Sequence, residues 1–322
     1  MDNNVEDKKV IARILFEGDN HLCSKHYGSH IDYPQESLYY YKKITDLAEK
    51  IGATHIIGLG DFTYGKFGTL EYRMAVENEI RRRNDITQHN YYMVKGNHDS
   101  SSTGMTEYEY YTLKGDIRPS TDLEFIGSKI FMIDYGDWEN KEIGTIDGNN
   151  IIATHGYFVF NGCTMPPYGN AITLNNFERW KGVQLILCGH IHNEHIIKGV
   201  ISDNETGNNT LVHYLPCLAR PSYTPGLMPE VGTVDILEIY EDGDTNFYKE
   251  SVPLMPLEKS FNIQKMEYDE AHRENIHVDV TDIVEKLNNY ERGVGSPEQV
   301  IMAMENVEMK YRMKAIELLK SV

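Results

Sequence analysis

Five short segments of the chain carry side chains that can bind metal ions, and each segment follows an apolar run. They are Asp19-Asn20-His21, Gly60-Asp61, Gly96-Asn97-His98-Asp99, Thr154-His155-Gly156 and Gly189-His190-Ile191-His192. Their ligand atoms are oxygens and imidazole nitrogens, which suit borderline divalent ions such as Mn, Fe or Zn. One such segment would mean little, but five indicate a single metal centre built along one edge of a sheet.

The spacing inside these segments indicates how they bind. Asp19 and His21 are two residues apart, so in an extended chain both side chains point the same way and can bind one ion together. His190 and His192 repeat this spacing, and Asp61 follows a glycine at a strand end, where a carboxylate can bridge two cations. Two ions about 3.5–4 Å apart can be held in this way and keep open positions for water and a phosphate. The predicted metal ligands are Asp19, His21, Asp61, Asn97, His155, His190 and His192.

The apolar runs before these segments predict the elements that position them. Residues 10–16, 55–60 and 91–94 are typical of buried strands, and residues 37–50 and 70–87 have helical spacing. This β-α-β-α-β order predicts right-handed crossovers and a largely parallel sheet.

Shorter strands and hairpins are expected in the middle of the chain. They fall at 123–126, 129–134, 150–153, 183–187, 195–200, 210–215, 233–240 and 246–252. We therefore expect an α/β fold, a two-sheet β-sandwich flanked by helices, with every metal-binding segment in a loop after a strand.

The pattern changes near Pro256, so we expect a catalytic domain over residues 1–255 and a small C-terminal helical appendage over residues 256–322. Two helices are expected there, at about 282–290 and from Ser296, each with a capping-box pattern. The appendage would act as a cap, a dimerisation element or a docking segment for a partner.

Composition limits the function classes. The 322 residues carry a net charge of -18, which argues against broad attraction to nucleic acid or an anionic membrane. A nuclease is still compatible, because bound cations make a cleft positive on an acidic protein. The start of the chain is polar, the longest apolar runs are strand-sized, and the 4 cysteines form no CxxC pair. We expect a cytoplasmic protein with reduced thiols, no signal peptide and no membrane partner.

The order D-x-H, G-D, G-N-H-D, H and G-H-x-H resembles the calcineurin-like metallophosphoesterase superfamily, over about residues 10–255. The resemblance implies a two-metal enzyme that hydrolyses phosphoesters by in-line attack of a metal-bridging hydroxide. It implies that Asp61 bridges the ions, that Asn97 and His155 help to hold the second ion, and that His98 is the catalytic residue facing the phosphate. The expected cofactor is a pair of divalent ions, with Mn preferred and Fe, Zn, Ni or Mg as alternatives.

Two further segments resemble SbcD-type repair exonucleases. One is residues 131–138, and the other is residues 214–220, which are similar to a Tyr-x-Gly-Ser-x-x-Arg stretch with Pro216 in place of the glycine. The resemblance implies DNA as the substrate, Arg220 as a substrate-binding residue, and an SbcC-like coiled-coil ATPase or a second copy of the chain as the partner of the C-terminal helices. From this resemblance we expect the DNA-capping domain of those nucleases to be shortened, because it would have to lie within residues 256–322.

Other functions stay open. Gly60-Asp61-Phe62-Thr63 does not continue as G-D-x-V-D-R-G, so the serine/threonine protein phosphatases are disfavoured. The first alternative is a phosphodiesterase or phosphatase for a nucleotide or another small molecule. The second is a metal-bound scaffold without turnover, which is disfavoured because a scaffold does not need His98.

Overall fold

The computed structural model describes residues 8–23, 30–65, 67–101, 104–158, 171–172, 179–192, 198–202, 209–220 and 231–265. The chain divides into two compact units, Met1–Phe261 and Asn262–Val322. The helices expected at 282–290 and from Ser296 lie outside the described residues. The division at residue 255 and the helical nature of the C-terminal appendage therefore stay predictions.

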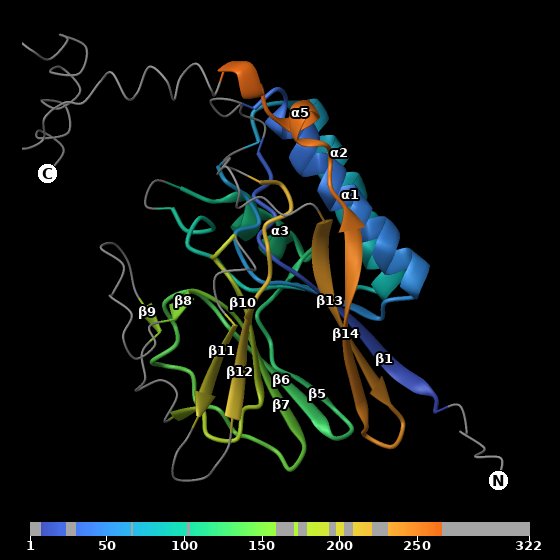
Figure 1. Cartoon of the computed structure of the whole chain (residues 1–322), viewed down its shortest axis with the longest axis vertical. Coiled ribbons are helices and arrows are strands. Elements are labelled where there is room, and N and C mark those ends of the chain that lie inside the picture. Colours follow the sequence, from blue (N-terminus) through green and yellow to red (C-terminus); the bar gives the residue numbers. More distant parts are fainter. Residues whose placement is uncertain are drawn as a thin grey trace, which may run out of the picture. The chain divides into compact units, whose positions relative to one another are not determined.

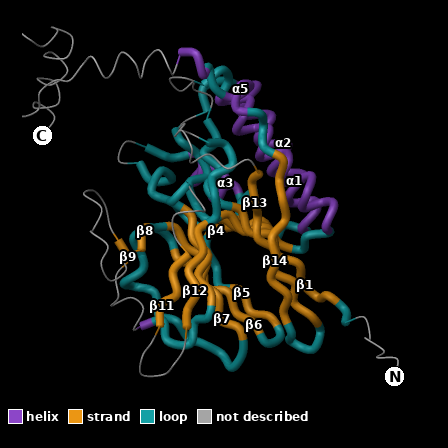
Figure 2. The backbone as a smooth tube through the Cα atoms, viewed as in Figure 1, coloured by secondary structure: helices purple, strands orange, loops and turns teal. Residues whose placement is uncertain are grey.

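Two six-stranded sheets form the body of the first unit (Figures 1 and 2). One sheet has the order β14-β13-β1-β2-β3-β4, with β14 Thr245–Pro253, β13 Val231–Tyr240, β1 Val10–Glu17, β2 His55–Gly58, β3 Tyr91–Met93 and β4 Arg118–Pro119. The other has the order β11-β12-β10-β7-β6-β5, with β11 Lys198–Ser202, β12 Asn209–Tyr214, β10 Leu185–Gly189, β7 Asn149–His155, β6 Ser128–Ile133 and β5 Leu123–Phe125. A small pair consists of β8 Tyr157–Phe158 and β9 Ala171–Ile172.

Both large sheets are mixed. β1, β2, β3 and β4 pair in parallel, as the β-α-β-α-β pattern predicts, but β13 and β14 join the free edge of β1 in antiparallel pairing. In the second sheet β6, β7, β10 and β12 pair in parallel, and β5 and β11 are antiparallel edge strands. The expected α/β fold with two sheets and flanking helices is confirmed, whereas the first sheet is less parallel than we expect from the sequence.

Helices α1 (Tyr33–Ile51) and α2 (Leu70–Thr87) lie side by side over the first sheet (Figure 1). The Asp32 side chain accepts a hydrogen bond from the Gln35 amide at the start of α1, and Gly52 ends the helix at a φ of 66°. This explains why α1 begins before the expected residue 37, because a capping aspartate followed by a proline in the first turn is a helix start. A short helix, α3 (Glu107–Lys114), was not expected from the sequence. Helix α5 (Leu257–Ser260) is the last described element of the first unit.

Alternation along β1 shows why the sheets stack. Leu15 packs with α1 and α2, whereas Ile14 and Phe16 pack between the two sheets. In the second sheet Met132 faces the same inter-sheet core, and Phe131 faces a third apolar cluster on the outer side. Strands covered on both faces read as continuous apolar runs, as observed in the sequence.

Candidate metal centre

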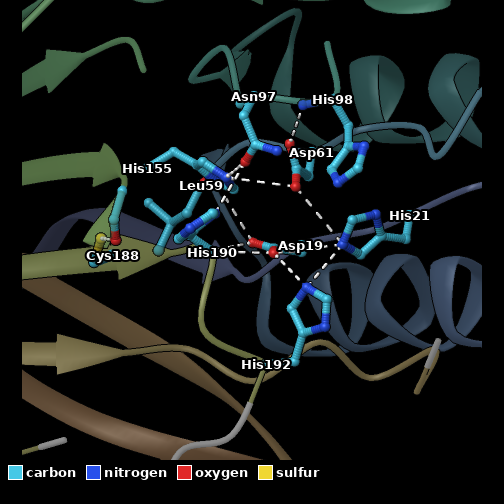
Figure 3. A network of polar contacts seen from close by, with 12 residues as sticks. Asp19, His21, Leu59, Asp61, Asn97, His98, His155, Cys188, His190 and His192 are labelled. Atoms are coloured by element: carbon cyan, nitrogen blue, oxygen red, sulfur yellow. Dashed lines mark hydrogen bonds and ion pairs between the residues drawn. The ribbon is translucent and has the colours of Figure 1, made fainter. Parts of the chain in front are cut away.

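The seven predicted ligands converge at one edge of the two sheets (Figure 3). One group is Asp19, His21 and His192, the other is Asp61, His155 and His190, and within each group the candidate ligand atoms lie within 4.8 Å of one another. The Asn97 side-chain oxygen joins the second group, 2.9 Å from His155 Nε2 and 2.9 Å from His190 Nδ1.

The ends of parallel strands bring these residues together. Glu17 at the end of β1 pairs with Gly58 of β2, and Gly58 pairs with Met93 of β3, so the three loops that follow start at the same level. In the second sheet Gly189 pairs with His155. Crevices beyond the carboxyl ends of parallel strands are the usual ligand sites of open α/β sheets.

Asp61 lies between the two groups. Its Oδ2 is 3.4 Å from His155 Nε2 and 3.7 Å from His21 Nε2. Asp19 reaches both groups as well, with Oδ2 3.1 Å from His192 Nε2 and Oδ1 3.6 Å from His155 Nδ1. A carboxylate in the position of Asp61 can contact ions in both groups at once.

The arrangement fits divalent cations. His21 Nε2 and His192 Nε2 lie 2.9 Å apart beside the buried Asp19 carboxylate, and two imidazole nitrogens at this distance need a shared proton or a cation. His155 Nδ1 lies 2.8 Å from the Leu59 carbonyl oxygen, which fixes the tautomer with a proton on Nδ1 and turns Nε2 toward Asn97 and Asp61. Such a backbone contact is the usual way to orient a metal-binding histidine.

Three of the predicted ligands have left-handed backbone conformations. His21, Asp61 and His190 have φ angles of 45°, 48° and 87°. Residues other than glycine seldom adopt such angles, and those that do gather at functional sites. The angle at His190 also interrupts the extended alternation, so His190 and His192 point to different groups and do not bind one ion together as their spacing suggests.

Glycines before the ligands permit the close approach of the loops. A Cβ atom at Gly96 would lie 2.2 Å from the Asp61 amide nitrogen, and a Cβ at Gly189 would lie 2.4 Å from Asp19 Oδ1. Any larger residue at either position would push two ligand loops apart.

The charges of neighbouring side chains keep the two carboxylates of the centre ionised. Burial favours the neutral form of Asp19, but His155, His192 and His21 outweigh it and hold the pKa of Asp19 well below its ordinary value. The pKa of Asp61 is lowered in the same way, against burial, chiefly by His155. Burial alone would lower the pKa of His155, but the Asp61 and Asp19 carboxylates raise it to about 9. The two carboxylates are therefore ionised near neutral pH.

His98 is placed differently from the seven ligands. Its side chain is exposed, its ring lies 5.4 Å from that of His21, and its backbone amide donates a 2.9 Å hydrogen bond to Asp61 Oδ1 (Figure 3). Burial of part of the ring lowers the pKa of His98. An exposed imidazole beside the ligands is free to meet a substrate.

Asp99 braces the loops and is completely buried. Its carboxylate accepts hydrogen bonds from the amides of Gly96 at 2.9 Å and Phe62 at 3.2 Å, so it ties the Asn97 segment to the Asp61 segment. Burial, with the nearby charge of Asp61, raises the pKa of Asp99 to about 7.

Arg220, predicted to bind substrate, has a different environment. It is 3% exposed, and its guanidinium donates to Glu36 Oε1 at 2.8 and 3.0 Å and to the Met255 carbonyl at 2.8 Å. A substrate would reach this side chain only by breaking a buried ion pair. We therefore correct the assignment and give Arg220 a structural role, joining α1 to the segment after β14.

Two aromatic residues lie beside the centre and were not predicted to be site residues. The Tyr64 ring lies 4.6 Å from the His98 ring, and the Tyr135 ring lies 6.0 Å from His155 and 6.2 Å from His190. Tyr64 follows the Gly60-Asp61 segment and Tyr135 follows β6, and this position after a strand is the feature of the sequence that could have indicated them.

Among the described residues, no helix has the length and apolar character needed to cross a membrane.

Comparisons with known proteins give one family. A family model described as calcineurin-like phosphoesterase matches residues 12–194, a range that includes all the predicted ligands. A search of curated proteins finds no significant match. Among solved structures 87 chains match, and one is a dimetal phosphatase from Danio rerio, 13% identical, with 77% of this chain and 100% of that chain covered. Its TM-score of 0.44 is too low to support an argument about function.

Proposed function

The chain belongs to the calcineurin-like phosphoesterase family, and from this premise we propose that it hydrolyses phosphodiester bonds with two metal ions, as an SbcD-like DNA nuclease. The observation that carries the proposal is the pair of buried His/Asp groups, linked by Asp61 and flanked by the exposed His98.

In this proposal the seven predicted ligands bind the metal ions, and His98 acts on the substrate. When bound, two divalent ions would supply Lewis-acid chemistry, because they polarise phosphate oxygens and lower the pKa of a bound water. Asp19, His21 and His192 would hold one ion, the second group with Asn97 would hold the other, and Asp61 lies within reach of both groups. From the exposed side His98 would contact the phosphate or the leaving oxygen, where it stabilises the transition state or, in its protonated form, donates a proton. We propose Mn as the native metal, with Fe, Zn, Ni or Mg as alternatives that the donor set also accepts.

Support for the nuclease comes from the segment that resembles SbcD-type enzymes. Residues 131–138 run from β6 to the side of the centre, where Tyr135 lies beside His155 and His190. We further propose a catalytic domain over residues 1–255, and residues 256–322 as the part that docks on an SbcC-like ATPase or on a second copy of the chain. A cytoplasmic location would match these partners.

A second candidate function is hydrolysis of a nucleotide or another small phosphoester. The net charge of -18 favours it, because an acidic surface does not gather a polyanion such as DNA. A scaffold without turnover is the third candidate, and the exposed His98 argues against it.

A substrate panel tests the proposal. Mn-loaded protein is expected to hydrolyse bis-p-nitrophenyl phosphate and to cleave labelled single- or double-stranded DNA. Hydrolysis of nucleotides without any strand cleavage would reject the nuclease in favour of the small-molecule enzyme. Metal-loaded, folded protein that cleaves no phosphoester would leave only the scaffold.

A further inference from the structure

Tyr64 lies beside His98, the exposed histidine to which the proposed chemistry assigns proton transfer. The ring centroids of Tyr64 and His98 are 4.6 Å apart, and the two planes are inclined by 36°. The same tyrosine ring lies 5.4 Å from His21, edge to face, and Tyr64 is 37% exposed. Part of the Tyr64 ring is therefore exposed to solvent beside the centre.

The backbone holds Tyr64 in this position. The Tyr64 amide donates to the Leu22 carbonyl at 3.1 Å, and the Leu22 amide donates to the Phe62 carbonyl at 3.0 Å. Leu22 also forms an isolated parallel bridge with Thr63. The segment that carries Tyr64 is thus paired with the segment that carries the predicted ligand His21, which places Tyr64 beside the first ligand group.

This placement has a consequence for the substrate. In-line hydrolysis sends the leaving oxygen away from the attacking water, and a residue that protonates it must come within hydrogen-bond reach of it. A group attached to that oxygen would then lie near the His98 imidazole, whose ring is 4.6 Å from the Tyr64 ring. Resting on the phosphoesterase function proposed above, we propose that Tyr64 is a specificity-determining residue that stacks on the leaving group and selects phosphoesters whose leaving group carries a planar aromatic ring, as a nucleoside does.

Tyr135 does not offer the same contact. Its ring lies near His155 and His190 and packs 5.1 Å from the Trp138 ring, on the side of the second ligand group. Stacked aromatic pairs gain about 0.5–1.5 kcal/mol beyond their buried area, which corresponds to about 2- to 13-fold in affinity. The expected preference for an aromatic group is of this size.

Binding to the Mn-loaded protein tests the inference without turnover. Phenylphosphonate and cyclohexylphosphonate have the same phosphonate and rings of similar size, but only the phenyl ring is planar and aromatic. Calorimetry is expected to show about 2- to 13-fold tighter binding of phenylphosphonate to the wild type. Tyr64→Phe should keep this ratio, and Tyr64→Leu should bring it to one.

Tyr110 supplies a matched control, because it is a tyrosine on α3 with the same 37% exposure. Tyr110→Leu should leave the ratio unchanged. The inference is overturned if Tyr64→Leu keeps the phenyl preference, or if Tyr135→Leu alone removes it. Equal binding of both phosphonates by the wild type would contradict the inference about Tyr64 but not the proposed phosphoesterase function. If neither phosphonate binds and no phosphoester is hydrolysed, both proposals are contradicted.

Turnover gives a second readout. Phosphodiesters with aryl and fluoroalkyl leaving groups of matched acidity differ mainly in aromatic character. Tyr64→Leu should lower kcat/KM for the aryl ester about 2- to 13-fold more than for the fluoroalkyl ester. An equal loss on both esters would mean that Tyr64 only supports the His98 ring, and would overturn the assignment.

Discussion

At the scale of single residues, the proposed metal ligands are separate from the residue proposed to meet the substrate. The seven predicted ligands lie in two groups that are largely buried, whereas His98 is exposed beside them. Removal of a ligand and removal of His98 should therefore have different effects.

His98→Ala is expected to lower kcat about 10²- to 10⁴-fold, the usual contribution of a general acid, while the metal content stays at the wild-type value. Steady-state kinetics and elemental analysis on the same sample would measure both. His89 is also exposed, and it follows α2, so His89→Ala is the matched control and should keep full activity. Loss of metal in His98→Ala would mean that this histidine is a ligand.

Arg220→Met tests whether the arginine is structural. Breaking a buried ion pair leaves Glu36 without its partner and is expected to lower the free energy of unfolding by about 3–5 kcal/mol, with kcat/KM per folded molecule unchanged. Arg82 also contacts acids, but its side chain is 38% exposed, so Arg82→Met should cost about 0–1 kcal/mol. Urea denaturation compares the two variants, and a raised KM with normal stability in Arg220→Met would restore the substrate-binding role.

The sequence could predict which polar residues meet at one edge of the sheets, because each motif places its polar residue directly after an apolar strand. It could not predict the division of His190 and His192 between two groups, because the left-handed φ of 87° at His190 arises from the packing of loops. The resemblance to known nucleases misplaced Arg220 for a similar reason, since a motif does not show which acid, here Glu36, lies opposite in space.

At the scale of elements, strands and helices with long apolar patterns were predictable, and short or edge elements were not. α2 has the expected bounds of residues 70 and 87, because its long run of helix-forming residues lies between the capping Thr69 and the left-handed Gln88. α3 is only 8 residues long and rich in Tyr and Glu, so its sequence has little apolar period, although Thr106 and Glu109 form a capping box. The antiparallel addition of β13 to β1 is a long-range pairing that local patterns do not contain.

His55, at the start of β2, makes stability depend on pH. Burial, with the charge of Arg118, lowers the pKa of His55 from 6.5 to about 4. The unfolded chain therefore binds a proton that the folded chain does not between these values, and stability falls as the pH decreases from 6.5 to about 4. At 1.36 kcal/mol per pKa unit, the loss is about 3 kcal/mol at most.

The comparison for this prediction is His55→Phe, which keeps an aromatic ring against Tyr92 and Phe125. Urea denaturation at pH 7 and at pH 4.5 is expected to show a smaller decrease for His55→Phe than for the wild type. Identical decreases in both proteins would mean that His55 is protonated without cost in the folded state.

At the scale of the whole molecule, the centre joins the two sheets. Asp19 and Asp61 come from loops of the first sheet, and His155 and His190 come from the second. Ions held by both sets of loops bind only the folded state, so they should stabilise the entire sandwich. Such convergence of loops that are far apart in the sequence follows from the shared level of the parallel strand ends.

Removal of metal should therefore lower the melting temperature. A ligand at about 100 times its Kd adds about 2.7 kcal/mol to the free energy of unfolding, which corresponds to about 5–10 °C for a domain of this size. Scanning calorimetry after chelation and after addition of Mn measures the shift. A melting temperature that does not respond to chelation or to Mn would mean that the loops bind no structural cation.

The central claim is that two groups of side chains hold two ions, and metal content per chain tests it most directly. Elemental analysis of Mn-loaded, gel-filtered protein is expected to give two ions per chain for the wild type. His192→Ala should retain the ion of the second group, His190→Ala should retain that of the first, and Asp61→Asn should weaken both. Less than one ion per chain in folded wild-type protein, or full metal content in all three variants, would contradict the account.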